Sequence, residues 1–363
     1  MKKEKFKILS IDGGGIRGIF PAMILANFEA ELKSKGVEKW QVYQNFNLIC
    51  GTSTGGIMAV ALALGIPAKE IYELYLNNAK VIFGSKRNMY SRLFNSAHTR
   101  TNLEQLIKDK FKEYHDGSDG EHPRLLHCKT PVAIPIYDLM EGRPSVLKSK
   151  YHDAFVRDFH IPAYQAALAT SAAPTYFDPY SSSYVDLSGL EKPFHNKVDG
   201  GVFANNPTLN GMIEAQKVFK LKMEDFSILS LGTGHQKFCD AGIDKKNKAR
   251  LKYGIKYWML EDGKKRLIDL FMQGQSQQIQ NIIGIMKNGI DKSEPDNFDY
   301  LRIDTELDST CPIELDETDK VKLDKLAEKA IIQFQTNATT MISLFGTGSK
   351  WSDTNTIINE NER

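Results

Sequence analysis

Ser53 lies at the centre of a G-x-S-x-G segment, with Gly51 and Gly55 on either side. Apolar runs precede and follow this segment, as expected for a strand, a sharp turn and a helix. Such a turn projects the serine hydroxyl above a sheet, and the glycines remove side chains that would clash there. The alternative is a helix that merely uses Ser or Thr as its N-cap. The segment indicates a nucleophilic serine suited to acyl transfer.

Asp199 ends a short predicted strand, 196–199, and is followed by Gly200 and Gly201. A nucleophilic serine needs a base, because an unassisted hydroxyl is hardly ionised at neutral pH. Aspartate is a weak base for a hydroxyl, so it requires a dry site in which burial raises the carboxylate pKa. The alternative for Asp199 is an Asx turn, a common role of Asp before Gly.

A third glycine-rich segment, DGGGIRG at residues 12–18, follows the first predicted strand, and we call it the glycine loop. Its residues Gly13, Gly15 and Gly18 fit the G-x-G-x-x-G pattern of dinucleotide sites. That pattern needs an acidic residue near the end of the next strand, which here ends in CGTS. A nucleotide cofactor is therefore weakly supported, a turn for tight strand–helix packing is the simpler alternative, and no cofactor is predicted.

Apolar runs separated by glycine turns predict strands alternating with helices. Strands are expected at 6–11, 46–50, 130–137, 196–199, 226–231 and 298–304. Helices are expected at 19–32, 55–64, from Pro207, at 264–286 and at 318–344. This alternation predicts an α/β fold, a mainly parallel sheet with helices on both faces. Ligands of open α/β sheets bind beyond the carboxyl ends of the strands, where the three glycine-rich turns lie.

The composition is that of a soluble globular protein. Hydrophobic residues make up 41% of the 363 residues, and 47 Lys and Arg against 45 Asp and Glu give a net charge of +2. This balance gives no electrostatic footprint for a nucleic-acid polymer. Four scattered cysteines suit a reducing cytosol. The N-terminus lacks the apolar region of a signal peptide. The longest apolar run, 56–68, is too short to span a bilayer. We therefore expect a cytoplasmic protein.

Together these segments resemble the patatin-like phospholipase family. The matches are DGGGIRG at 12–18, GTSTG at 51–55 and DGG at 199–201, with further matches in ATSAAP at 169–174 and SLGTG at 230–234. The resemblance extends over most of the chain. It implies a patatin-like catalytic domain at 6–345, with a core at 6–235, a helical C-terminal part at 236–345 and a polar tail at 346–363.

The resemblance also implies roles for individual residues. Ser53 would be the nucleophile and Asp199 the base of a Ser–Asp dyad. The oxyanion hole would come chiefly from Gly13, Gly14 and Gly15, with Arg17 helping to hold the loop or the charge and Gly18 completing the motif. Gly51 and Gly55 would form the turn around the nucleophile, and Gly200 and Gly201 the turn after the base.

A histidine offers a rival arrangement. His235 follows a predicted strand, and the chain order Ser53, Asp199, His235 is that of an α/β-hydrolase triad. The simpler interpretation is a loop histidine outside the site. The other seven histidines show no metal-ligand spacing, so no metal is predicted.

Residues 81–94 interleave apolar and basic side chains, which suits either a lid packed over the site or a patch that binds an anionic bilayer. The basic run 245–266 favours a solvated face. The length and layout of the chain also resemble the branch of patatin-like bacterial effectors that a cyclic oligonucleotide activates in antiphage defence. A dianionic cyclic dinucleotide would need cationic and stacking groups, for which the candidates are Lys86, Arg87, Tyr90 and Arg92, or the run 245–258 with Tyr253, Tyr257 and Trp258.

We therefore predict a serine acyl hydrolase of the phospholipase A type. Its substrates would be membrane glycerophospholipids at the inner face of the membrane, a cyclic dinucleotide would be a possible activator, and an oligomer is possible. Four alternatives remain: a constitutive lipid hydrolase, a triad esterase, a binding module whose site is inactive and a nucleotide-cofactor oxidoreductase.

Overall fold

The strand predicted at 6–11 lies in the middle of an eight-stranded sheet, in the order β5-β6-β3-β2-β1-β7-β8 with β4 beside β3. The computed structural model describes residues 4–84, 95–235, 252–260, 266–288, 296–307 and 312–348. The strands are β1 (Phe6–Ile11), β2 (Leu48–Gly51), β3 (Val132–Asp138), β4 (Arg143–Lys148), β5 (Tyr180–Val185), β6 (Glu191–Asp199), β7 (Phe226–Leu231) and β8 (Asp299–Ile303).

The predicted parallel arrangement is confirmed for the centre of the sheet. β1 pairs in parallel with β2 and β7, β2 with β3, and β7 with β8. These central strands are nearly continuous apolar runs because both of their faces are covered by helices. β4, β5 and β6 run antiparallel at one side. The sequence prediction missed β4 and β5, whose side chains are mixed in polarity and mostly not fully buried.

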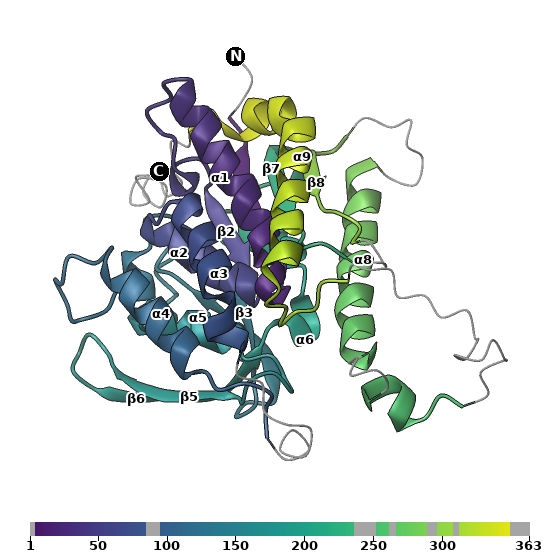
Figure 1. Cartoon of the computed structure of the whole chain (residues 1–363). Coiled ribbons are helices and arrows are strands. Elements are labelled where there is room, and N and C mark those ends of the chain that lie inside the picture. Colours follow the sequence, from purple (N-terminus) through teal and green to yellow (C-terminus); the bar gives the residue numbers. More distant parts are fainter. Residues whose placement is uncertain are drawn as a thin grey trace.

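The longer helices are α1 (Ile19–Ser34), α2 (Thr54–Leu64), α3 (Ala68–Phe83), α4 (Thr101–Lys112), α5 (Ala163–Thr170), α7 (Thr208–Lys217), α8 (Arg266–Asn288) and α9 (Lys320–Phe345). A four-residue helix, α6 (Gly201–Ala204), follows β6. Figure 1 shows α1, α2, α3 and α9 gathered over one face of the sheet, with α8 standing at the edge of the molecule. The ends observed for α1, α8 and α9 lie within two residues of those predicted.

Alternate residues of β1 face two separate apolar clusters. Leu9 and Ile11 belong to the larger cluster, which includes α1, α2, α5 and α9. Ile8 belongs to the smaller one, with Met212 of α7 and Ile283 of α8. Because side chains alternate across a strand, this division confirms that helices cover both faces.

The C-terminal part of the chain adds a strand as well as helices, since β8 pairs with β7. The start of the predicted tail is held to the body, where Lys7 Nζ donates to the Gly348 carbonyl at 2.6 Å. Within the described residues, no helix has the length and apolarity needed to cross a bilayer. Residues 85–94, and with them most of the predicted lid or membrane patch, lie outside the described residues.

Candidate active site

Ser53 occupies the turn between β2 and α2, as the G-x-S-x-G segment predicts. Its backbone has φ 56° and ψ −124°, a conformation that an L-residue adopts only when its surroundings impose it. A Cβ on Gly51 would lie 2.0 Å from the Gly55 carbonyl oxygen, and one on Gly55 would lie 2.3 Å from the Ile11 carbonyl oxygen. Both glycines are therefore required by the close approach of β1, β2 and α2 around the serine.

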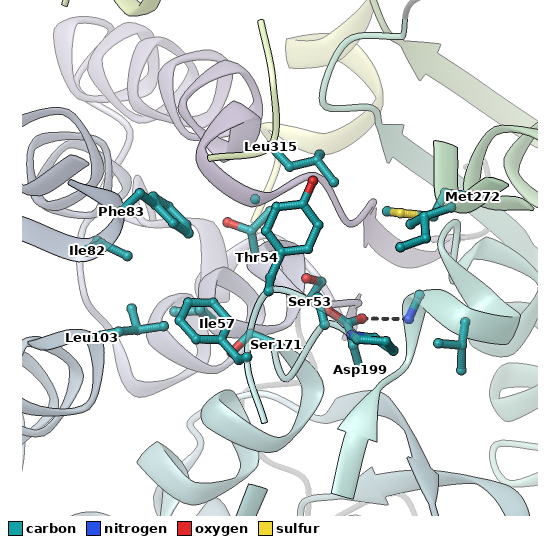
Figure 2. Close-up of a pocket in the computed structure, with 18 of the residues that line it drawn as sticks. Ser53, Thr54, Ile57, Ile82, Phe83, Leu103, Ser171, Asp199, Met272 and Leu315 are labelled. Atoms are coloured by element: carbon teal, nitrogen blue, oxygen red, sulfur yellow. Dashed lines mark hydrogen bonds between the residues drawn. The ribbon is translucent and has the colours of Figure 1, made fainter. Parts of the chain in front are cut away.

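Asp199 meets Ser53 because β2 and β6 lie end to end along one edge of β3. β2 is parallel to β3, with Cys50 opposite Ala133, whereas β6 is antiparallel, with Asp199 opposite Ile136. β4 occupies the other edge of β3. The carboxyl ends of β2 and β6 therefore point toward each other, and Ser53 and Asp199 lie where they meet (Figure 2).

Burial dominates the electrostatics of Asp199, which is 3% exposed. It raises the pKa of the carboxyl to about 7, although hydrogen bonds from the Ser53 hydroxyl and the Gly201 amide act in the opposite direction. The Gly201 amide donates to Asp199 Oδ1 at 2.6 Å, and its position after Gly200 places it at the start of α6. A carboxylate whose pKa lies near neutrality, beside a serine hydroxyl, can act as a general base.

Thr170 holds the backbone of Ser53. Its Oγ1 accepts the Ser53 N–H at 3.1 Å and donates to the Pro135 carbonyl of β3 at 2.7 Å. Thr170 lies in the segment ATSAAP, and the next residue but one, Ala172, accepts the Asp199 N–H at 3.1 Å. This segment therefore joins the turn around Ser53 to the end of β6.

An apolar cavity of about 170 Å³ opens onto both residues. Figure 2 shows Ser53 and Asp199 at its centre, with Phe83, Ile82 and Leu103 on one side and Met272 on the other. Further apolar lining comes from Ile57, Phe177, Leu315, Val202 and Phe271. A cavity with this lining suits a hydrocarbon chain.

The glycine loop lies against Ser53. Not all of its backbone N–H groups are free to donate a hydrogen bond to a bound substrate. The Gly13 amide, which the resemblance implies as an oxyanion donor, donates instead to the Asn205 carbonyl at 3.0 Å. In the described part of the chain, no hydrogen bond takes up the N–H groups of Gly14 and Gly15. Gly15 lines the cavity with φ +56°. The structure therefore favours Gly14 and Gly15 as the donors for a developing oxyanion.

Arg17 and Gly18 follow on the same loop. Arg17 Nε donates to the Gly14 carbonyl at 3.4 Å, so this side chain lies against the loop. Burial lowers the pKa of the Arg17 guanidinium, while Asp269 raises it. Gly18 ends the short helix Gly15–Gly18 and leads directly into α1.

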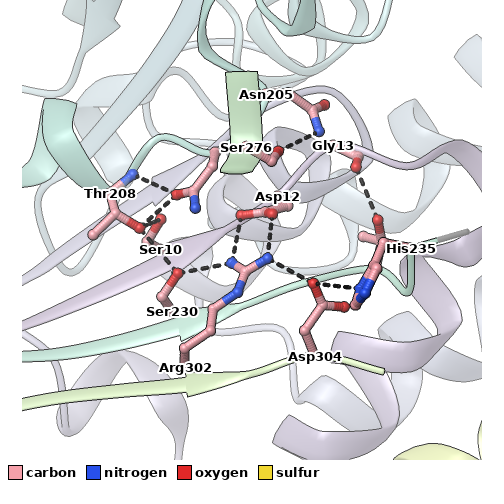
Figure 3. Close-up of polar contacts among 12 residues, drawn as sticks. Ser10, Asp12, Gly13, Asn205, Thr208, Ser230, His235, Ser276, Arg302 and Asp304 are labelled. Carbon is pink, nitrogen blue, oxygen red and sulfur yellow. Dashed lines mark hydrogen bonds and ion pairs between the residues drawn. The ribbon is translucent and has the colours of Figure 1, made fainter. Parts of the chain in front are cut away.

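Arg302 of β8 is a residue that the sequence analysis missed. Figure 3 shows its guanidinium between Asp12 and Asp304. It donates to Asp12 Oδ1 at 3.0 Å and Oδ2 at 2.7 Å, and to Asp304 Oδ2 at 2.8 Å. Burial raises the pKa of Asp12 to about 6, against the opposing charge of Arg302. Burial would also raise the pKa of Asp304, but His235 and Arg302 outweigh it and lower that pKa to about 2.

Arg302, Asp12 and Asp304 form a group that we call the arginine cluster. His235 lies beside this cluster and does not line the cavity. Its Nδ1 lies 3.4 Å from Asp304 Oδ2, and its side chain is 42% exposed. The hydrogen bond to Asp304 raises the pKa of the imidazole against the effect of burial. This position favours the dyad over the triad.

One group of side chains has the spacing of metal ligands among the described residues: His115, Asp119 and His127, whose ligand atoms lie within 4.8 Å of one another. The Arg124 amide donates to His127 Nδ1 at 2.9 Å, so Nε2 bears the proton when the ring is neutral. Nε2 therefore has no lone pair for a metal, and it lies 3.2 Å from Asp119 Oδ1. Neither Asp119 oxygen has a hydrogen-bond partner among the described residues, but Arg124 Nε lies 3.3 Å from Oδ2 and balances its charge. The absence of a metal stays a prediction.

The model of the patatin-like phospholipase family matches residues 9–211 of this chain. A Vibrio cholerae protein named cGAMP-activated phospholipase is 36% identical over 240 residues, which are 64% of this chain and 65% of that protein. Patatin-like protein 3 of Arabidopsis thaliana is 30% identical over 325 residues, or 82% of this chain and 73% of that protein. The crystal structure of VipD from Legionella pneumophila superposes with a TM-score of 0.39 and 13% identity, covering 92% of this chain and 67% of that one.

Proposed function

The chain belongs to the patatin-like phospholipase family, and we propose that it hydrolyses fatty-acyl esters of membrane glycerophospholipids through a Ser53–Asp199 dyad. The observation that supports this most directly is the strained, buried serine beside a carboxyl whose pKa is about 7, at the wall of an apolar cavity. In this cavity the acyl chain would be held while its ester carbonyl lies over Ser53.

The reaction would proceed in two steps. Asp199 takes the Ser53 proton as Oγ forms a bond to the ester carbonyl carbon, and the Gly14 and Gly15 amides stabilise the negative oxygen. The C–O bond to the glycerol oxygen then breaks, and this oxygen leaves with the proton from Asp199. Asp199 next deprotonates a water molecule that attacks the acyl–Ser53 ester, and a fatty acid is released while Ser53 regains its proton.

The substrate would enter from a bilayer across the rim of the cavity. Val202 of α6 and Phe271 of α8 both line the cavity and face the outside, with exposed fractions of 41% and 60%. The two helices are joined here, since Gln275 Nε2 donates to the Val202 carbonyl at 2.7 Å. Apolar side chains at the mouth of an apolar cavity would let an acyl chain pass from membrane to serine without crossing water.

Product analysis tests the hydrolase. Wild-type protein should release fatty acid and lysophospholipid from phosphatidylethanolamine and phosphatidylglycerol vesicles, and a fluorophosphonate should label Ser53. Ser53→Ala and Asp199→Asn should each lower the turnover by about 10³-fold or more, because each removes a reacting group. Normal turnover by either folded variant would refute the dyad.

We further propose that the enzyme acts in the cytoplasm at the inner face of the membrane, and that a cyclic dinucleotide activates it. This proposal is supported by the name of the 36% identical Vibrio cholerae relative and by the need to restrain a site that would otherwise attack its own host's membrane. Most of the candidate nucleotide-binding residues lie outside the described residues, namely Lys86, Arg87, Tyr90, Arg92 and most of the basic run 245–266. Among the described candidates, Tyr253 has an exposed fraction of 44%. Tyr257 is buried, and the Arg266 guanidinium carbon lies 4.6 Å from the centre of its ring.

Activation would require a ligand that binds the active state more tightly than the inactive one. Fatty-acid release should therefore be low in the protein alone and rise at micromolar concentrations of one member of a panel of cyclic di- and trinucleotides. High activity that no member of the panel changes would identify a constitutive lipid hydrolase.

A further inference from the structure

The glycine loop is held by three residues that lie more than 200 positions later in the sequence. Thr233 Oγ1 donates to the Gly13 carbonyl at 2.9 Å, and the Leu315 carbonyl accepts the Ile16 N–H at 2.9 Å. Arg302 binds the carboxylate that begins the loop. All three partners lie beyond residue 211, where the match to the family model ends. The part of the chain outside that match therefore completes the surroundings of the loop.

The pair between Arg302 and Asp12 has the geometry that fixes a carboxylate in orientation as well as in position. Two guanidinium nitrogens of Arg302 donate to the two carboxylate oxygens of Asp12, at 3.0 and 2.7 Å. The side chain of Arg302 is 13% exposed and that of Asp12 is 4% exposed. A planar guanidinium that binds both oxygens resists rotation of the carboxylate, which a lysine ammonium does not. Arg302 is itself held by Asp304 and by Ser230 Oγ at 2.9 Å.

Asp12 transmits this restraint to the reacting centre through the backbone. It is the last residue before Gly13, Gly14 and Gly15, and its own amide donates to the Leu231 carbonyl at 3.0 Å. Glycine backbone has no side chain to restrict its conformation, so the loop depends on its neighbours for a fixed direction of its N–H groups.

We propose that Arg302 is a positioning residue for hydrolysis at Ser53: by binding Asp12 it fixes the Gly14 and Gly15 amides where the ester oxygen becomes negative. This inference rests on the proposed function. Donors that are already oriented stabilise an oxyanion without reorganising during the reaction, and loss of one such donor lowers kcat by about 10²–10³-fold. Misdirected donors should lower the rate less than absent ones.

The test compares Arg302→Lys and Arg302→Gln with Arg157→Gln, which removes a surface arginine paired with Asp158. Arg302→Gln leaves Asp12 buried without a partner, so the double variant Asp12→Asn/Arg302→Gln is included because it removes both charges. Turnover of a soluble short-chain ester is measured per serine labelled by a fluorophosphonate. Affinity for an acyl trifluoromethyl ketone, which forms an oxyanion on the serine, is measured in parallel.

We expect the Arg302 variants and the double variant to lose about 10–100-fold in kcat and in trifluoromethyl ketone affinity, with KM within about threefold of wild type. The double variant should lose no more than Arg302→Gln alone, because the two side chains act as one unit. Arg157→Gln should match wild type. A purely structural arginine would instead lower the melting temperature and the fraction of labelled serine while kcat per labelled serine stayed unchanged, and that result would overturn the proposal.

Hydrogen exchange separates this inference from the proposed function. The amides of residues 12–18 should exchange at least about tenfold faster in the double variant than in wild type, while those of α2 stay unchanged. If the wild-type protein neither hydrolyses esters nor labels at Ser53, the proposed function fails, and the exchange still decides whether Arg302 orders the loop. Unchanged exchange in residues 12–18 would refute the positioning role.

Discussion

The Ser53 hydroxyl lies beside the Asp199 carboxylate (Figure 2), and both residues are withdrawn from water, with exposed fractions of 7% and 3%. Both line the same cavity, and His235 does not. As the proposed base, Asp199 would obtain its basicity from burial, because an aspartate in water has a pKa of about 3.9. The first two predictions below follow from that condition.

The first prediction concerns the pH dependence of the rate. Asp199 can take a proton only as a carboxylate, and its pKa is about 7. The value of kcat/KM for a soluble ester should therefore rise with pH, fall about tenfold per unit below about pH 6.5 and level off above about pH 8. A rate that is constant from about pH 5 to 8 would contradict Asp199 as the base.

The second prediction is that Asp199→Asn stabilises the protein while it removes activity. The folded carboxyl has a raised pKa, so between about pH 4 and 7 the native state holds a proton that the unfolded state has lost. The stability from this group is thus present at low pH and lost as pH rises through about 7. The amide introduced by Asp199→Asn has no charge to bury, so the variant should gain on the order of 1–3 kcal/mol over wild type at about pH 8.5 and little at about pH 4.

Thermal or urea unfolding at the two pH values measures this difference. Equal stability of wild type and Asp199→Asn at about pH 8.5 would show that burial of the carboxylate is not costly.

The third prediction concerns Thr170, whose hydroxyl bridges the Ser53 N–H and the Pro135 carbonyl. Thr170→Val keeps the shape but leaves both buried groups without partners, so it should cost about 1–3 kcal/mol of unfolding free energy. It should also lower kcat by about tenfold, because the strained turn of Ser53 loses its support. Thr170→Ser keeps the hydroxyl and serves as the matched control, so equal losses in both variants would exclude the hydrogen bonds as the cause.

The fourth prediction concerns the rim of the cavity, and it separates the entry of a membrane substrate from the hydrolysis step itself. Val202→Ser and Phe271→Ser remove apolar surface at the mouth of the cavity and should lower vesicle hydrolysis about 5–20-fold. Hydrolysis of a soluble short-chain ester should change less than about threefold, since the dyad is untouched. Ile332→Ser is the control, because Ile332 is 59% exposed on α9 and does not line the cavity. A similar loss with both substrates would argue against entry at this rim.

The fifth prediction tests the triad. His235 pairs with Asp304 at the edge of the arginine cluster, so His235→Ala should keep ester hydrolysis within about fivefold of wild type. A loss as large as that of Ser53→Ala would instead make His235 a catalytic residue.

The sequence by itself determined which residues could react and what kind of fold holds them. The G-x-S-x-G segment, the glycine loop and the Asp-Gly-Gly triplet have local signatures, because a tight turn needs glycine wherever backbones approach closely, as at Gly55. The central strands could be predicted because strands covered on both faces are continuous apolar runs. The same reasoning gave no sign of β4 and β5, whose side chains are mixed in polarity and form no continuous apolar run.

Only the tertiary structure decided how these pieces meet. β6 runs antiparallel to β3, so Asp199 faces the end of β2, and strand direction is set by pairing between distant segments, not by local pattern. The Gly13 amide donates to the Asn205 carbonyl, so Gly14 and Gly15 are the glycines of the loop proposed as oxyanion donors. Arg302 binds Asp12 across 290 positions of sequence, and an arginine in a short strand of mixed polarity has no local feature that identifies its partner. Such contacts depend on the packing of the whole chain, because a buried charge finds its partner only when distant segments come together.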